Sequence, residues 1–150
     1  MSDSCRVIRA ADPKTGETGL DYFAGIVKET VGSEQLALQV VRIPPGIRSA
    51  AHSHGEHESA AYVLEGEVVT WFGDELLKHV TVRKGDFLFI PAGVPHVAAN
   101  YADTEAVALI ARSDPGAQES VKPFPRLDAL AHLENPPGKL PPPRAPRRAI

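Results

Sequence analysis

Short apolar runs separated by turn-forming residues make up most of the chain, from position 20 to position 112. Valine, isoleucine and aromatic residues dominate several of these runs, and such residues are typical of β-strands. No stretch in this span keeps a long 3.6-residue hydrophobic period, so the pattern does not favour helices. Many strands at such short spacing predict an all-β domain, either a sandwich or a barrel. The strands that we expect cover residues 22–28, 35–43, 49–54, 59–64, 67–72, 76–82, 86–90, 96–100 and 106–112.

The two ends of the chain follow other patterns. Residues 1–19 are polar and rich in turn formers, and we expect an irregular N-terminal arm there. In the C-terminal extension, 113–150, only residues 126–134 have the pattern of a short helix. Residues 135–150 are rich in proline, which removes backbone donors that packed secondary structure needs. We therefore expect three parts: the arm, a β-barrel over 20–112, and an extension whose proline-rich tail is partly disordered.

Composition and charge narrow the class of partner. The formal net charge is −3, which gives no sign of binding to nucleic acid or to an anionic membrane. The single cysteine, Cys5, cannot form an internal disulfide. The N-terminal residues lack the apolar core of a signal peptide, and no apolar run approaches the roughly 20 residues of a membrane helix. We expect a soluble, cytoplasmic protein.

Four of the six histidines lie in two short segments, 46–58 and 85–100. His52 and His54 are two positions apart, so on a strand their side chains point to the same face. His96 begins a later expected strand and could reach the same place from the other side. Imidazoles and a carboxylate that converge from two strands are suitable ligands for a first-row divalent metal.

The same two segments resemble the two sequence motifs of the cupin superfamily. In the first segment the matching residues are Gly46, His52, His54, Glu58 and Gly66. In the second segment they are Gly85, Pro91, Gly93, His96 and Asn100. The resemblance covers residues 35–112 and implies a jelly-roll barrel, the double-stranded β-helix of cupins, with a metal inside. It also implies a small-molecule substrate and a homodimer.

One spacing leaves the carboxylate ligand open. Glu58 is one residue farther from Gly66 than the cupin pattern has it. Counting forward from His54 selects Glu58, whereas counting back from Gly66 selects Ser59, which is a poor ligand. A β-bulge near Ser59 would reconcile the two counts, because an extra residue resets the alternation of faces. His57 is another candidate, and a site with neither His57 nor Glu58 is the third alternative.

The resemblance leads to a functional hypothesis. We assign the metal ligands to His52, His54, Glu58 and His96, and catalytic roles to Glu58 and Tyr62. The expected cofactor is iron, with manganese, nickel, zinc and copper as alternatives. We expect a metal-dependent oxidoreductase of the dioxygenase type. A metal-dependent isomerase, decarboxylase or lyase, and a non-catalytic binder of small molecules, are the alternative functions.

Three arginines are candidate binders of carboxylate or phosphate groups. They are Arg42, Arg48 and Arg83. A guanidinium suits both anions, but each of these positions is also typical of a solvated residue on a strand.

Overall fold

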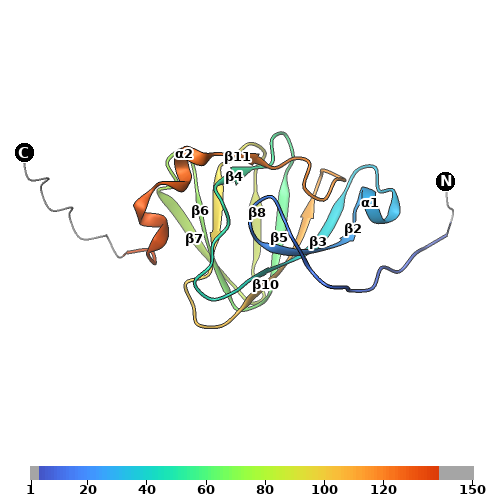
Figure 1. Cartoon of the computed structure of the whole chain (residues 1–150), viewed down its shortest axis with the longest axis horizontal. Coiled ribbons are helices and arrows are strands. Elements are labelled where there is room, and N and C mark those ends of the chain that lie inside the picture. Colours follow the sequence, from blue (N-terminus) through green and yellow to red (C-terminus); the bar gives the residue numbers. More distant parts are fainter. Residues whose placement is uncertain (1–3, 139–150) are drawn as a thin grey trace, which may run out of the picture.

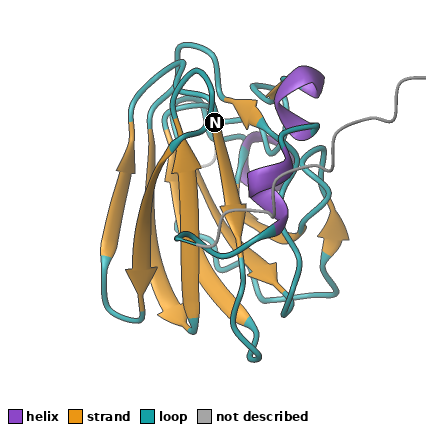
Figure 2. Cartoon of the chain, turned by 90° about the vertical axis from the view of Figure 1, so that its left-hand side faces the viewer, coloured by secondary structure: helices purple, strands orange, loops and turns teal. Residues whose placement is uncertain are grey.

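The computed structural model describes residues 4–138, and its main feature is a pair of antiparallel sheets that face each other (Figures 1 and 2). The larger sheet has the order β1-β2-β3-β10-β5-β8, and the smaller has the order β11-β4-β9-β6-β7. The larger sheet consists of β1 (Lys14–Thr15), β2 (Asp21–Ile26), β3 (Ala37–Ile43), β10 (Ala106–Arg112), β5 (Ser59–Glu65) and β8 (Phe87–Ile90). The smaller sheet consists of β11 (Lys122–Pro123), β4 (His52–Ser53), β9 (His96–Ala99), β6 (Glu67–Phe72) and β7 (Lys78–Arg83).

The predicted all-β jelly-roll is confirmed. Each of the nine expected strands overlaps an observed one, because alternating or continuous apolar runs between turn formers identify strands well. The two strands that we did not expect, β1 and β11, have only two residues each and lie outside the predicted barrel span. Such short pairings carry almost no periodic signal in a sequence.

The strand β6 of the smaller sheet is buried on both of its faces. Within β6, Val68 and Thr70 line the inside of the barrel, whereas Val69 and Trp71 belong to a core cluster on the other face. That cluster also contains Leu127 and Leu133 from the end of the described chain and joins them to β9 through Val97. A strand covered on both faces needs apolar residues at successive positions, which explains the continuous run in β6.

The C-terminal extension covers this outer face. The expected helix over 126–134 is present as two shorter pieces, α2 (Pro125–Asp128) and the 3-10 turn η1 (Ala131–Glu134). Leu127 and Leu133 are buried, and Arg48 holds the segment by ion pairs to Asp128 (3.1 Å) and Glu134 (2.9 Å). The remaining helix, α1 (Lys28–Val31), follows β2. Within residues 4–138, no helix is long and apolar enough to cross a membrane. Most of the proline-rich tail lies outside the described residues.

Gly66 provides a test of how tightly the barrel closes at one end. It joins β5 to β6 with φ of 75°, and a Cβ at this position would lie 2.6 Å from the carbonyl oxygen of Glu105 and 2.9 Å from the Cα of Ala106. Gly85 also has a positive φ, of 90°, but a Cβ there would have no atom within 4 Å. Both alanine variants carry the strain of a left-handed backbone, but only Gly66→Ala adds overlap with backbone atoms.

We therefore expect Gly66→Ala to reduce the free energy of unfolding by about 1–3 kcal/mol more than Gly85→Ala does. Urea denaturation of the two variants and the wild type measures this difference. Equal losses in the two variants would show that the β5–β6 corner is looser than described.

Candidate metal centre

Two paired strands of the smaller sheet bring three histidines together. β4 pairs with β9 so that His52 lies directly opposite His96, and His54 follows two positions after His52. The ring centroids are 4.3 Å apart for His52 and His96, 4.9 Å for His52 and His54, and 5.5 Å for His54 and His96. One ring nitrogen from each histidine lies within 4.8 Å of the others. One metal ion can therefore contact all three.

Hydrogen bonds to the backbone fix two of these rings. The Nδ1 atom of His52 lies 2.7 Å from the carbonyl oxygen of Ala50, and that of His96 lies 2.9 Å from the carbonyl oxygen of Val94. A carbonyl oxygen only accepts, so Nδ1 carries the hydrogen and Nε2 keeps a free lone pair in both rings. This arrangement is typical of histidines that bind a metal through Nε2.

The three histidines are neutral near pH 7. Burial lowers the pKa of His52 to about 3 and that of His54 to about 2, and it also lowers the pKa of His96. The nearby charge of Arg112 acts in the same direction on all three rings. Because the rings resist protonation, their lone pairs are available to a metal ion at physiological pH. The donor set fits a first-row divalent metal.

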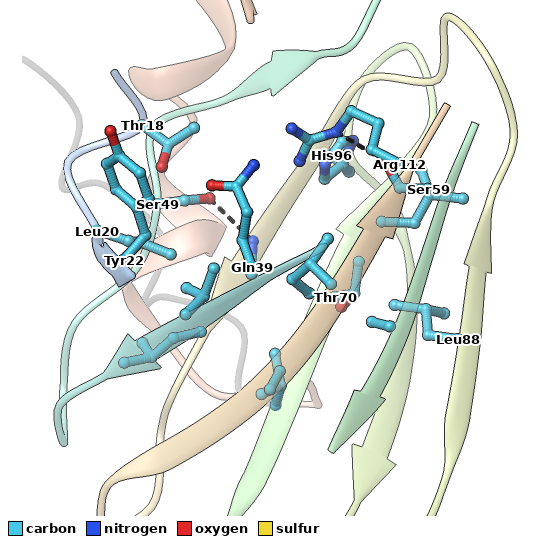
Figure 3. Close-up of a pocket in the computed structure, with 18 of the residues that line it drawn as sticks. Thr18, Leu20, Tyr22, Gln39, Ser49, Ser59, Thr70, Leu88, His96 and Arg112 are labelled. Atoms are coloured by element: carbon cyan, nitrogen blue, oxygen red, sulfur yellow. Dashed lines mark hydrogen bonds between the residues drawn. The ribbon is translucent and has the colours of Figure 1, made fainter. Parts of the chain in front are cut away.

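The cluster lies at a cavity inside the barrel, with walls from both sheets (Figure 3). The volume of the cavity is about 110 Å³. Most of its surface is apolar and comes from residues such as Val63, Leu88 and Ile110. The part of the chain that the structure describes contributes no Asp, Glu or Lys side chain to this lining.

Comparisons with known proteins agree with this architecture. Residues 39–111 match the family model of the cupin domain. A Cupin 2 conserved barrel domain protein from Salinispora arenicola superposes with a TM-score of 0.61 at 19% identity, covering 74% of this chain and 91% of that one. A structure described as a predicted oxalate decarboxylase, from Thermotoga maritima, gives 0.60 at 22% identity, covering 72% of this chain and 98% of that one.

The chain belongs to the cupin superfamily. Among curated proteins, a germin-like protein of Oryza sativa subsp. japonica is 28% identical over 112 residues, which is 71% of this chain. The cupin spans half the length of that relative. Membership of the superfamily and the three-histidine cluster together indicate a divalent metal ion.

The structure does not bring Glu58 to the histidines. Glu58 is exposed just before β5, and its backbone N–H donates to the hydroxyl of Ser113. Ser59 is buried instead and lines the cavity. No bulge lies near Ser59, because β5 pairs with β8 and β10 without a register shift from Ser59 to Tyr62. The irregularity of the β5–β10 ladder lies farther along, between Val63 and Glu65. Counting back from Gly66 therefore identifies the inward position, and that position holds a serine.

His57, the second candidate ligand, and Tyr62, the other expected catalytic residue, also lie outside the cluster. The cluster therefore matches the third alternative, a site with neither His57 nor Glu58. His57 is half-buried, with its Nδ1 3.4 Å from the hydroxyl of Ser113. Tyr62 lies on the outer face of β5, where its ring is 4.7 Å from that of Phe87. We expected a catalytic role for Tyr62, but its side chain does not line the cavity. Residues 59, 61 and 63 of β5 face inward, and residue 62 does not.

Arg112 is the site residue that the sequence reasoning missed. It is the last residue of β10, and its side chain lines the cavity beside Ser59 (Figure 3). The alternation of β10 was the available signal, since Ala108 and Ile110 share its inward face. The three arginines that we selected as candidates instead make ion pairs outside the cavity: Arg42 with Glu105, Arg48 with Asp128 and Glu134, and Arg83 with Glu67.

Proposed function

We propose that this cupin is a metal-dependent enzyme that oxidises a small organic molecule with dioxygen. The observation that supports the proposal is a set of three neutral histidines, without a carboxylate, at an apolar cavity. Bound to three histidines, a divalent iron ion would supply open coordination positions for both a substrate and dioxygen. The proposed ligands are His52, His54 and His96.

The residues of the cavity favour oxidation over the alternative reactions. Isomerases, decarboxylases and lyases commonly need a general acid or base that moves a proton. Among the described residues that line the cavity, no Asp, Glu or Lys is available for that role, which leaves the hydroxyl of Tyr22 besides the histidines. The hydrogen bonds of His52 and His96 to backbone carbonyls hold the rings in place. Glu58 and Tyr62 have no part in the proposed site.

The ligand assignment is tested by metal content. We expect His52→Ala, His54→Ala and His96→Ala each to weaken metal binding at least about 100-fold, because each removes a direct donor. Loss of a residue that only supports a ligand costs up to about 100-fold, and loss of the ligand itself should cost more. Elemental analysis of protein purified without added metal gives the result. His57→Gln and Glu58→Gln are the matched controls and should keep the wild-type metal content. Loss of metal in Glu58→Gln would contradict the three-histidine site.

The reaction class is tested with an oxygen electrode. We expect iron-loaded protein to consume oxygen with a small enol, catechol or thiol, and His96→Ala to lose at least about 100-fold of that rate, because the ion is no longer held. Zinc-loaded protein is the control and should consume none. Product formation by the zinc-loaded protein in the absence of oxygen would place this cupin with the isomerases, decarboxylases and lyases instead.

We also propose that the cupin forms a homodimer through the outer face of its larger sheet. No described helix or sheet covers this face, in contrast to the smaller sheet. The strand β8 forms its edge, with Phe87 81% and Phe89 59% exposed. From this edge the apolar surface continues across the outer face of the sheet. The strand register places the following side chains in one row: Phe87, Tyr62, Leu109, Val40 and Phe23. Contiguous exposed apolar surface of this kind is typical of an interface, and symmetric dimers are the commonest assembly.

A charge at the edge of this face, where Phe87 is the most exposed aromatic side chain, should separate the dimer. We expect Phe87→Lys to weaken association at least about 30-fold, because a lysine would be desolvated without a partner in the interface. Sedimentation equilibrium measures the dissociation constant. Leu77→Lys, at a 71% exposed position in the loop between β6 and β7, is the matched control and should associate as the wild type does. A monomeric wild type at high concentration would contradict the proposal.

A further inference from the structure

Arg112 places a guanidinium group inside the barrel, next to the proposed metal ligands. β10 lies between β3 and β5 in the larger sheet, and Arg112 is paired with Ser59 across the β5–β10 ladder. Its Nε donates to the hydroxyl oxygen of Ser59 at 3.2 Å (Figure 3). Its charge acts on His52, His54 and His96. Arg112 and the three histidines therefore line the same cavity.

One donor of this guanidinium has no partner within the described chain. The Nη1 atom is buried and makes no hydrogen bond. A buried donor without an acceptor is costly, and the cost is larger for a charged group. Protein interiors rarely keep such a group unless something else supplies the acceptor. The open position lies at a cavity, where a bound molecule could supply the missing acceptor.

The charges around the cavity point to the kind of molecule. No carboxylate of the described residues lies within ion-pair distance of Arg112, although the charge of Asp114 acts on it from farther away. Three neutral histidines would add no negative charge to a divalent cation. An arginine and a divalent ion in one apolar cavity leave an excess of positive charge that an anion would offset.

We propose that Arg112 binds the carboxylate group of a small organic acid whose carbon part lies against the apolar wall, beside the metal. This inference rests on the proposed function and names its substrate class. A guanidinium matches a carboxylate through two parallel hydrogen bonds. The cavity of about 110 Å³ restricts the acid to few carbon atoms, and Val63, Leu88 and Ile110 give it an apolar surface to contact. A phosphate shares the charge, but it is more strongly hydrated and has no carbon part to contact the apolar wall.

Isothermal titration with pairs of nearly identical probes tests the inference. Propionate and propionamide have the same shape and differ in charge, so we titrate both into the zinc-loaded and the metal-free protein. We expect the wild type to bind propionate at least about tenfold more tightly than propionamide in both states, because charged hydrogen bonds add to the affinity. Arg112→Gln should lose this preference in the metal-free protein and keep only the part due to the zinc ion in the loaded protein. Arg112→Lys should keep the charge but only part of the affinity. Arg42→Gln, which removes an arginine from the barrel exterior, is the control and should bind as the wild type does.

The outcomes separate this inference from the proposed function. Metal content is measured on the same samples. If the wild type holds no metal but prefers propionate, and Arg112→Gln removes that preference, the proposed function is contradicted and the inference is supported. A metal-loaded Arg112→Gln variant with undiminished propionate binding overturns the inference alone. Inorganic phosphate is titrated in parallel, and tighter binding of phosphate than of propionate overturns the carboxylate assignment. Circular dichroism shows whether each variant is folded, and if Arg112→Gln does not fold, undiminished propionate binding by Arg112→Lys overturns the inference.

Discussion

The pairing register between β4 and β9 is the constraint on which the site depends. It places His52 opposite His96, and a shift of one residue in β9 would turn His96 outward and bring Val97 into the cavity. Polar side chains hold this register. Ser49 bonds to the backbone N–H and carbonyl of Ala98, using its hydroxyl and its own N–H. Asn100 is buried and its amide bonds to the carbonyl oxygens of Ile43 and Thr104, so the asparagine of the second motif supports the strand rather than the chemistry.

The C-terminal extension covers the outer face of the smaller sheet, whereas no described element covers that of the larger sheet. This difference is visible in the sequences of the strands. β6 has four successive buried residues, because the C-terminal extension covers the face that would otherwise meet water. β3 and β5 alternate between buried and more exposed positions instead. Some of their exposed positions are nevertheless occupied by large apolar side chains, Leu38 and Leu64. A solvated sheet face would favour polar residues there, so these positions support the proposed dimer interface.

The strands and the three histidines could be predicted from the sequence, and the fourth ligand position could not. The His-x-His spacing fixes a shared face whatever the surrounding fold is, so His52 and His54 follow from the pattern alone. The choice between Glu58 and Ser59 depends on the phase at which β5 begins. That phase is set by pairing with residues far away in the chain, Ile90 on β8 and Arg112 on β10. Motif counting from one side or the other has no access to those contacts, and it favoured the residue with the better ligand chemistry.

Ser59 and Arg112 together determine the charge of this part of the barrel interior. The Nε of Arg112 lies 3.2 Å from the hydroxyl of Ser59, so a carboxylate at position 59 would form an ion pair with the guanidinium. Such a pair would neutralise the arginine and satisfy its donors within the protein. A serine accepts one hydrogen bond without adding charge, and the buried Nη1 donor of Arg112 stays without a partner. Because position 59 carries no carboxylate, the positive charge of Arg112 stays in the cavity, where an anionic group of the proposed substrate would offset it.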